Sequence, residues 1–375
     1  MSDPLNRIVG RAWLTDAGAA FHLESGAAIS PALVAYETYG RLNANRSNAI
    51  LVCHALTGSA HAAGVDRQGR HGWWDGLIGP GRGLDTDRYY IVCSNIIGSC
   101  YGSTGPGSTD HRTGAAYGPE FPVVTIRDMV RAQRLLLWKL GVERLHAVVG
   151  GSMGGMQALE WSLLFPGDVS LVIPIATAGF HSPWRTAFSS VATEALALGR
   201  AAGNEAAGLR LARKIAMLSY RSSGEFDQRF AADPPVETGT TALPAHPVRS
   251  YLEHQGNRLA GRFDACSYTT LVRAMELHDI RRGRSDLAGT LGGIIHPTLC
   301  IGISTDLLYA PGEVRKLAGM IPGGRYREID SIHGHDAFLI EYDQLNRIIG
   351  GFLAGYERAH PSISLSIHPE EYQLP

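Results

Sequence analysis

The stretch LHAVVGGSMGG, residues 145–155, decides how this sequence is interpreted. Residues 145–149 are almost continuously apolar, which is typical of a central strand buried on both faces. A glycine-rich turn that contains Ser152 follows, and residues 156–165 have a helical pattern. The sequence therefore predicts a strand, a tight turn and a helix in that order.

Ser152 is the candidate nucleophile. A Gly-x-Ser-x-Gly turn between a strand and a helix holds its serine on a strained corner, with the hydroxyl exposed. Gly150 and Gly154 allow the strand and the helix to approach each other closely. The alternative interpretation is a glycine-rich turn with an incidental serine.

The serine needs two partners, because a serine hydroxyl is a weak nucleophile until a histidine base, oriented by a carboxylate, activates it. In an α/β hydrolase these partners follow the serine in the order Asp, His. Asp306 comes after the apolar segment 298–303, where a carboxylate can leave the sheet edge and meet an imidazole. We predict Asp306 as the acid. Asp330 is the rival, but its position suits a turn.

His335 and His333 compete for the role of base. His335 follows Gly334 at the start of the last predicted helix, which suits a catalytic imidazole carried on a loop, so we predict His335. His333 suits an exposed loop position. The two histidines can also be interpreted as metal ligands, but no third ligand at a useful spacing is evident, so we expect no metal.

An acyl-transfer site also needs backbone donors for the oxyanion. One donor is expected directly after the nucleophile, and the second in the loop after an early strand. The segment HALTG, residues 54–58, follows the apolar segment 49–53. We therefore predict that the N–H groups of Leu56 and Met153 form the oxyanion hole.

The rest of the chain alternates short β-branched runs with helical patterns. This alternation predicts an α/β protein with a mostly parallel central sheet and helices on both faces, which together with the serine turn is the α/β-hydrolase fold. The clearest helix, 125–140, starts with a capping pair of Thr125 and Asp128. Strands are predicted at 33–39, 49–53, 89–94, 145–149, 170–176, 298–303 and 325–329.

The strand pattern is interrupted once. Between residues 180 and 286 it gives way to helical stretches at 183–198, 206–220 and 267–278, and strands resume at 298. We therefore predict an α/β-hydrolase core at 1–179 and 287–375, with an inserted helical cap, or lid, at 180–286. The segment 231–247, rich in Pro and Thr, is predicted as a loop, and 362–375 as a loosely held tail.

Composition excludes several classes of protein. With 34 Lys and Arg against 35 Asp and Glu, the 375-residue chain has a net charge of -1, so we expect no nucleic-acid partner.

The longest apolar stretches, such as 171–178, are far shorter than the ~20 residues of a membrane span, and no leader pattern opens the chain. Five cysteines without a CxxC pair predict neither a disulfide framework nor a thiolate metal site. We expect a cytoplasmic protein with no membrane partner.

Longer blocks along the chain match one known family. They include HALTG at 54–58, GWWD at 72–75, IGPG at 78–81, GSTGP at 102–106, GSMGGMQALEW at 151–161, YRS at 220–222, RFDA at 262–265 and GHDAFL at 334–339. In these blocks the chain resembles the homoserine O-acetyltransferases, α/β-hydrolase-fold enzymes of methionine biosynthesis. The resemblance covers residues 15–355 and is far more specific than the serine turn alone.

The resemblance implies a ping-pong reaction, in which Ser152 takes an acetyl group from acetyl-CoA and passes it to the side-chain hydroxyl of L-homoserine. Ser152, Asp306 and His335 match the family triad. Arg221 would hold the carboxylate of the amino acid and Asp336 its ammonium group, and these charges are complementary. The resemblance also implies no permanently bound cofactor, with acetyl-CoA as a co-substrate, and a homodimer.

Other activities are compatible with the same triad. The cap segment 187–204 departs from the family pattern, and Ser99 and Cys266 stand where relatives commonly have other residues, which affects the expected donor and acceptor more than the chemistry. The main alternative is an ester hydrolase of short acetate esters, in which water resolves the acyl-enzyme. Succinyl-CoA as donor, L-serine as acceptor and a catalytically silent scaffold are the others.

Overall fold

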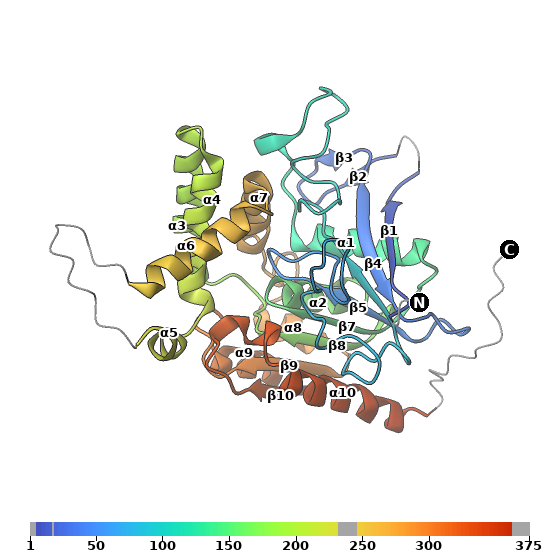
Figure 1. Ribbon diagram of the computed structural model, residues 1–375. Helices are drawn as coiled ribbons and strands as arrows, with labels where there is room; N and C mark the ends of the chain where they lie inside the picture. The colour runs from blue at the N-terminus through green and yellow to red at the C-terminus, as the bar shows by residue number, and fades with distance from the viewer. Residues whose placement is uncertain (1–4, 17–18, 232–245, 362–375) are drawn as a thin grey trace.

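A single large sheet forms the centre of the molecule. The computed structural model describes residues 5–16, 19–231 and 246–361. The strands are β1 Ile8–Trp13, β2 Phe21–His22, β3 Ala28–Ile29, β4 Leu33–Tyr39, β5 Ala49–Cys53, β6 Tyr90–Ser94, β7 Leu145–Gly151, β8 Val169–Ile175, β9 Thr298–Ile303 and β10 Gly324–Ile329. Eight of them form one sheet in the order β1-β4-β6-β5-β7-β8-β9-β10 (Figure 1). Neighbours from β6 to β10 are parallel, whereas β1 with β4 and β4 with β6 are antiparallel.

All seven strands predicted from the sequence are confirmed, with ends shifted by at most two residues. The sequence pattern does not predict β1. This strand lies at the sheet edge, and its Ile8, Val9 and Trp13 are each more than half exposed. It therefore lacks the buried apolar run from which the central strands were predicted. Pairing with β4 makes this segment a strand, and that contact is not visible in its local sequence.

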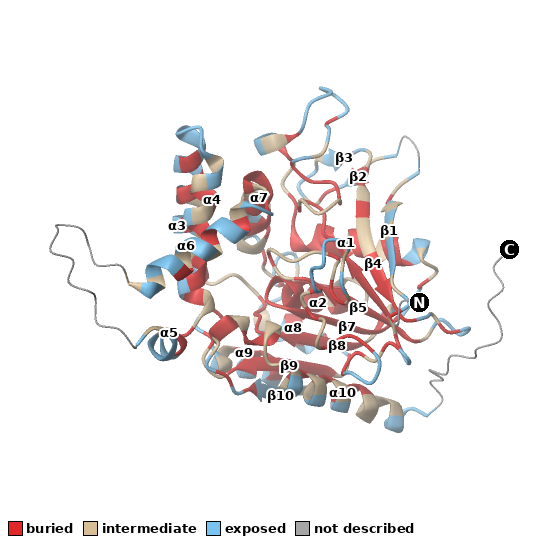
Figure 2. Cartoon of the chain, viewed as in Figure 1, coloured by how far each residue is buried: buried red, intermediate tan, exposed pale blue. Residues whose placement is uncertain are grey.

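Helices cover both faces of the sheet, as the sequence predicts (Figure 2). Alternate residues of a strand point to opposite faces. Leu51 and Val148 therefore pack with α1 and α2, whereas Ile50 and Val149 pack with α10. The core helices are α1 Ile126–Lys139, α2 Met153–Leu164, α8 Leu287–Gly292, α9 Pro311–Met320 and α10 Tyr342–Ala359. No described helix combines the length and apolar character that a membrane span requires.

Six described helices lie in the chain between β8 and β9, and the first five of them make up the insertion. They are α3 Pro183–Ala201, α4 Glu205–Tyr220, α5 Ser223–Phe230, α6 Pro247–Ala260 and α7 Ala265–Glu276. α3, α4, α6 and α7 stand together to one side of the sheet (Figure 1). Phe180 and Asp279 form an antiparallel bridge, so both ends of the insertion lie side by side. The element order is the one expected for a cap at 180–286, and the exact domain boundaries stay a prediction.

The sequence pattern misses α5 and α6. α6 buries only Tyr251, Gly256 and Leu259 among its residues, too few to produce an apolar periodicity. The predicted loop 231–247 also extends one residue too far. Pro247 is the first residue of α6, a position that proline favours. The remainder of that loop, 232–245, and the predicted tail 362–375 lie outside the described residues.

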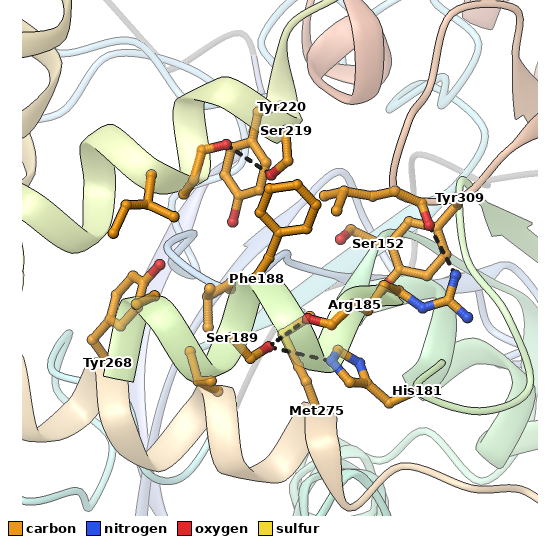
Figure 3. Close-up of a pocket in the computed structure, with 16 residues that line it drawn as sticks. Ser152, His181, Arg185, Phe188, Ser189, Ser219, Tyr220, Tyr268, Met275 and Tyr309 are labelled. Carbon is orange, nitrogen blue, oxygen red and sulfur yellow. Dashed lines mark hydrogen bonds between the residues drawn. The ribbon is translucent and has the colours of Figure 1, made fainter. Parts of the chain in front are cut away.

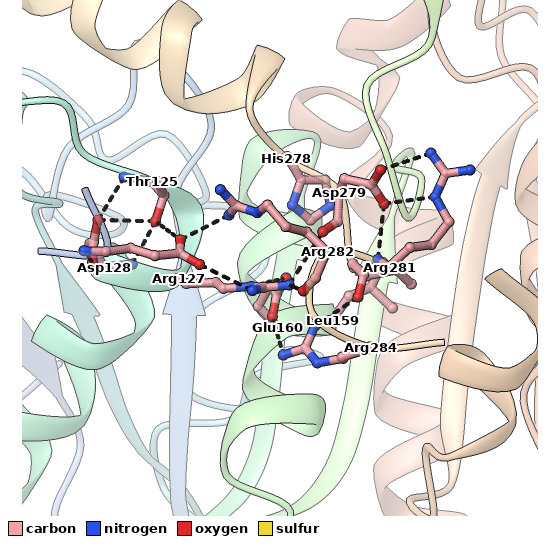
Figure 4. A network of polar contacts seen from close by, with 12 residues as sticks. Thr125, Arg127, Asp128, Leu159, Glu160, His278, Asp279, Arg281, Arg282 and Arg284 are labelled. Atoms are coloured by element: carbon pink, nitrogen blue, oxygen red, sulfur yellow. Dashed lines mark hydrogen bonds and ion pairs between the residues drawn. The ribbon is translucent and has the colours of Figure 1, made fainter. Parts of the chain in front are cut away.

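A buried ion network ties the end of the insertion to the core helices (Figure 4). Glu160 of α2 is 1% exposed and accepts hydrogen bonds from Arg127 of α1 at 3.0 Å and from Arg284 at 2.8 Å. Arg127 also donates to the carbonyl oxygens of Asp279 and Arg282. One carboxylate thus fixes the place where the chain returns from the inserted helices to the sheet.

Replacing Glu160 with Gln removes the charge that the buried guanidinium of Arg127 and the half-buried guanidinium of Arg284 share. Because unpaired buried charges are strongly unfavourable, we expect Glu160→Gln to lower the free energy of unfolding by about 3 kcal/mol. Glu143→Gln, at an exposed position, is the control and should leave it unchanged. Urea unfolding followed by circular dichroism measures both, and equal stability of the two variants would show that the network is not a major contributor.

Candidate active site

The turn that carries Ser152 has the conformation that the sequence predicts. Ser152 has φ +56° and ψ −121°, a backbone conformation rarely adopted by residues other than glycine. A Cβ on Gly154 would lie 2.1 Å from the carbonyl oxygen of Cys53, so α2 can approach β5 only with glycine there. This tight junction of β7 and α2 places the Ser152 hydroxyl at the carboxyl end of the sheet.

The structure brings the three predicted triad residues together. His335 Nε2 lies 2.8 Å from Ser152 Oγ, and His335 Nδ1 lies 2.7 Å from Asp306 Oδ2. The N–H groups of Leu308 and Tyr309 donate to the other oxygen of Asp306 at 2.8 and 3.0 Å. Asp306 therefore holds the imidazole with Nδ1 protonated, which leaves Nε2 as the acceptor for the serine proton.

The rival residues lie elsewhere. Asp330 is exposed and accepts a hydrogen bond from Ser304 Oγ at 3.1 Å. His333 Nδ1 lies 3.3 Å from a carboxylate oxygen of Glu225 in α5. The geometry therefore agrees with the predicted choice of Asp306 and His335 over their rivals.

One detail of the expected site is wrong, because His335 does not start the last helix. It lies in a separate 3-10 helix, η2 Gly334–Leu339, and α10 begins only at Tyr342 because Ile340 and Glu341 leave the helical conformation. Gly334 has φ +62°, and a Cβ there would lie 2.8 Å from the backbone of Arg221. Glycine thus lets the histidine loop pass directly against the inserted helices.

His335 is buried, and burial alone would lower its pKa. The carboxylate of Asp306 and its hydrogen bond outweigh that effect, with a smaller contribution from Asp336, so the pKa of His335 is raised above its usual 6.5. The Tyr309 ring stacks on the imidazole with 5.2 Å between the ring centres. The base is thus fixed in orientation and made more basic by its partner.

The two predicted oxyanion donors are available. Met153 is the first residue of α2, where the helix dipole favours negative charge, and neither its N–H nor that of Leu56 donates to another described residue. Buried His54 holds the Leu56 loop: burial lowers its pKa to about 4, so it is neutral, and Nε2 accepts from Ile96 N–H. Nδ1 then carries the proton and donates to the Ala55 carbonyl oxygen at 2.8 Å.

Two cavities meet at Ser152 and Leu56. The first is mainly apolar and lies between the inserted helices and the core; Figure 3 shows Ser152 facing it together with Phe188, Tyr220 and Tyr309. The second is more polar, and its lining contains the catalytic histidine and several charged side chains. Its lining includes Thr57, Trp73, Arg213, Arg262, His335 and Asp336.

Comparison with known proteins agrees with this geometry. Residues 48–342 match the family model for the alpha/beta hydrolase fold. The homoserine O-acetyltransferase of Moorella thermoacetica is 49% identical over 347 residues, which cover 88% of this chain and 93% of that protein. This chain belongs to the homoserine O-acetyltransferase family.

Solved structures extend the comparison. The homoserine O-acetyltransferase from Bacillus anthracis matches with a TM-score of 0.86 at 30% identity, over 92% of this chain and 97% of that one. Esterase E22 matches with a TM-score of 0.83 at 28% identity, over 92% of this chain and 99% of that one. A protein named as an esterase thus has nearly the same fold as the homoserine O-acetyltransferases.

Arg221 and Asp336, assigned by the family resemblance, lie beside each other. Arg221 Nη2 is 3.3 Å from Asp336 Oδ2, and Arg221 Nη1 donates to both oxygens of Glu225 at 3.0 and 3.1 Å. Burial lowers the pKa of Arg221, but these carboxylates raise it overall, so the guanidinium stays charged. Asp336 lines the polar cavity, whereas Arg221 lines neither cavity.

Sequence reasoning gave no role to Arg213 and Arg262, which also line the polar cavity. Arg262 donates to the Thr57 carbonyl oxygen at 2.9 Å and to Tyr101 Oη at 2.6 Å, so it holds the loop that carries Leu56. Arg262 belongs to a block of the family resemblance. Arg213 could have been found as the residue seven before Tyr220, on the same face of one helix.

A metal site was considered at the two histidines. Within the part of the chain that the structure describes, no cluster of three His, Cys, Asp or Glu side chains is arranged to hold a metal ion. The expectation of a metal-free site stays a prediction.

Activity should depend on pH through His335. The imidazole must be neutral to accept the serine proton, and its pKa is raised, so kcat/KM should rise with pH through a midpoint above 6.5. Asp306→Asn removes the carboxylate, which should lower the midpoint and reduce kcat by roughly 10⁴-fold.

His333→Gln is the matched control and should retain the wild-type pH profile. If the midpoint moves in His333→Gln but not in Asp306→Asn, then His333, and not His335, is the base.

Proposed function

We propose that this protein transfers an acetyl group from acetyl-CoA to the side-chain hydroxyl of L-homoserine through a covalent acetyl-Ser152, as a step of methionine biosynthesis. The observation that carries the proposal is the aligned Ser152–His335–Asp306 set at the junction of two cavities, in a chain 49% identical to a homoserine O-acetyltransferase.

The first half-reaction loads the serine. His335 Nε2 takes the Ser152 proton as Oγ attacks the thioester carbonyl, and the oxyanion accepts hydrogen bonds from the N–H groups of Leu56 and Met153. Collapse of this intermediate breaks the carbon–sulfur bond. The imidazolium returns its proton to the departing CoA thiolate, and acetyl-Ser152 remains.

The second half-reaction runs the same steps with an alcohol. His335 removes the proton of the homoserine hydroxyl, the oxygen attacks acetyl-Ser152, and Ser152 leaves with the proton. The proposed acceptor contacts are Asp336 for the ammonium group and Arg221 for the carboxylate. Asp336 follows His335 directly in η2 and lines the same cavity, which supports an ammonium contact close to the base.

A hydrolase is the second candidate, since esterase E22 has a similar structure. In that case water takes the place of homoserine on the same acyl-enzyme. The two candidates differ only in what resolves acetyl-Ser152, so acceptor-dependent product formation separates them.

The decisive assay follows CoA thiol release from acetyl-CoA or succinyl-CoA, with L-homoserine, L-serine or no acceptor, and identifies the product by mass. We expect release with acetyl-CoA and homoserine, with O-acetylhomoserine formed. Ser152→Ala should lose at least roughly 10⁴-fold in kcat because the nucleophile is gone. Ser25→Ala, an exposed serine, is the control.

Three outcomes would revise the proposal. CoA release at the same rate with and without an acceptor would favour the hydrolase over the transferase. Faster turnover with succinyl-CoA or L-serine would change the donor or the acceptor. Full activity in Ser152→Ala would rule out a mechanism through acetyl-Ser152.

We also propose a homodimer that forms through the inserted helices. On α3, Trp184, Val191 and Leu198 repeat every seven residues, and on α4 Leu211 and Leu218 do the same; all five are 48–63% exposed. An apolar stripe of this spacing on two adjacent helices suits packing against the same helices of a second copy.

The dimer is tested by sedimentation velocity. We expect the wild type to sediment as a dimer and the double variant Leu198→Glu, Leu218→Glu as a monomer, because the charges would be buried in the interface. Val65→Glu, which places the same charged residue at an exposed apolar position of the core, should stay dimeric. A wild-type monomer, or a dimeric double variant, would contradict the proposal.

We assign the protein to the cytoplasm, with no permanently bound cofactor. All five cysteines are free, which suits a reducing compartment. The proposed co-substrates, CoA thioesters and free amino acids, are metabolites of the cell interior. Acetyl-CoA binds only for the first half-reaction.

A further inference from the structure

One buried arginine of the inserted helices reaches the loop that carries Asp306. Arg185 lies in the first turn of α3 and is 3% exposed. Its Nη1 donates to the Leu308 carbonyl oxygen at 2.8 Å, and Nη1 and Nη2 donate to the two carboxylate oxygens of Glu313 in α9 at 2.8 and 2.9 Å. Nη2 also donates to the Phe180 carbonyl oxygen at 3.0 Å. The side chain therefore joins the start of the insertion to the segment between β9 and α9.

We propose that Arg185 is a positioning residue for the reaction at Ser152. It holds the acid loop, residues 306–309, and through the ring of Tyr309 it fixes the orientation of the catalytic imidazole. The inference rests on the proposed function, because it takes Ser152 as the nucleophile that this imidazole activates. Arg185 lies outside the sequence blocks on which the family resemblance rests, so the resemblance assigns it no role.

The first link runs through the backbone of the acid loop. The N–H groups of Leu308 and Tyr309 donate to Asp306 Oδ1 at 2.8 and 3.0 Å, and Oδ2 accepts from His335 Nδ1 at 2.7 Å. The Leu308 carbonyl and the Tyr309 N–H belong to one planar peptide unit. Because Arg185 holds that carbonyl, it also sets the direction of an N–H group that orients the acid.

The second link runs through the Tyr309 ring. The guanidinium carbon of Arg185 lies 4.5 Å from the centre of this ring. The ring stacks on the His335 imidazole with 5.2 Å between the centres and 29° between the planes. Tyr309 is 1% exposed, and Figure 3 shows it beside Arg185. The attraction between a cation and an aromatic ring thus holds the ring that packs on the base.

Arg185 keeps its charge although it is buried. Burial lowers the pKa of Arg185, but the hydrogen bonds to Glu313 and the nearby negative charge raise it overall. A buried guanidinium is stable where its donors are paired, and a forked contact with a carboxylate is among the strongest pairings. Arg185 and Glu313 therefore form a rigid connection from α3 to α9.

The same charge acts on the base, which distinguishes this role from a purely structural one. Burial lowers the pKa of His335, as does the positive charge of Arg185, whereas Asp306 and Asp336 raise it and outweigh both. Loss of Arg185 should therefore raise this pKa further. The other titratable or charged groups around the imidazole stay in place, and they are Tyr309, Arg213, Tyr220, Arg221 and Arg262.

The test measures acetylation of Ser152 by p-nitrophenyl acetate, followed through p-nitrophenol release, together with kcat and KM for acetyl-CoA in the presence of L-homoserine. We expect Arg185→Met to lower the acetylation rate and kcat by roughly 10- to 100-fold, because a misplacement of about 1 Å in a catalytic group has an effect of that size. KM for acetyl-CoA should stay unchanged, and the midpoint of the pH profile should move to higher pH.

Two further variants separate charge from geometry. Arg185→Lys keeps the charge but cannot form the forked contact with Glu313, so it should have a near-normal midpoint and recover only part of the rate. Glu313→Gln removes the negative charge beside the guanidinium and should move the midpoint to lower pH. A loss of packing alone does not predict opposite movements in Arg185→Met and Glu313→Gln.

Arg200→Met is the matched control. Arg200 lies in the last turn of the same helix, is also ion-paired, with Glu205 at 2.9 Å, and lines neither cavity at Ser152. The control should keep the wild-type rate and pH profile. Circular dichroism reports the folding of each variant. If Arg185→Met does not fold, wild-type rates and midpoints in Arg185→Lys and Glu313→Gln would overturn the proposal.

Each remaining outcome rejects a defined claim. A folded Arg185→Met with wild-type kcat and midpoint would show that Arg185 only ties the insertion to the core. A raised KM for acetyl-CoA at unchanged kcat would make Arg185 a contact of the donor and not a positioning residue. If the wild type never carries acetyl-Ser152, the proposed function fails together with this inference, whereas an acetylated wild type with unaffected variants rejects the inference alone.

Discussion

The backbone of Ser152 is the constraint on which the rest of the site depends. A non-glycine residue with a positive φ costs about 1–3 kcal/mol, and it persists only where surrounding structure enforces it. Here the enforcement comes from the centre of the sheet. β7 is paired on both sides, the Ser152 N–H donates to the Ile175 carbonyl oxygen of β8 at 2.9 Å, and α2 packs against Cys53 of β5 through Gly154. The strained corner orients the serine hydroxyl toward His335 and the start of α2 toward the oxyanion.

The acid and the base reach this corner from a part of the chain that follows the inserted helices. Asp306 comes after β9 and His335 after β10, so both depend on strands that pair only once the chain has returned to the sheet. The buried carboxylate of Glu160, bound by Arg127 and Arg284, fixes that return. The sheet thus supplies the chemistry, whereas the inserted helices supply Phe188, Arg213 and much of the wall of both cavities.

The sequence predicted the parts of the molecule whose signals are local. The strand–turn–helix around Ser152, the capping box of Thr125 and Asp128, and the seven strands predicted from short β-branched runs all depend on neighbours in the chain. It did not predict β1, which is a strand only through pairing with β4, or α6, which buries too few residues to show a period.

The same distinction holds in the site. The order Ser, Asp, His and the local positions of the residues predicted Asp306 over Asp330 and His335 over His333, and the contacts in the structure agree with that choice. The position of Arg213 beside Tyr220 and the occupied state of Arg221 required the structure, because no local pattern reports which charges meet across separate helices.

The central claim is that Ser152 carries the acetyl group, and intact-protein mass spectrometry tests it most directly. After mixing with acetyl-CoA and no acceptor, the protein should gain the mass of one acetyl group, which peptide fragmentation should locate on Ser152. Adding L-homoserine should remove that mass while O-acetylhomoserine appears. O-acetylhomoserine formed at full rate by a protein that never carries the acetyl group would contradict the account.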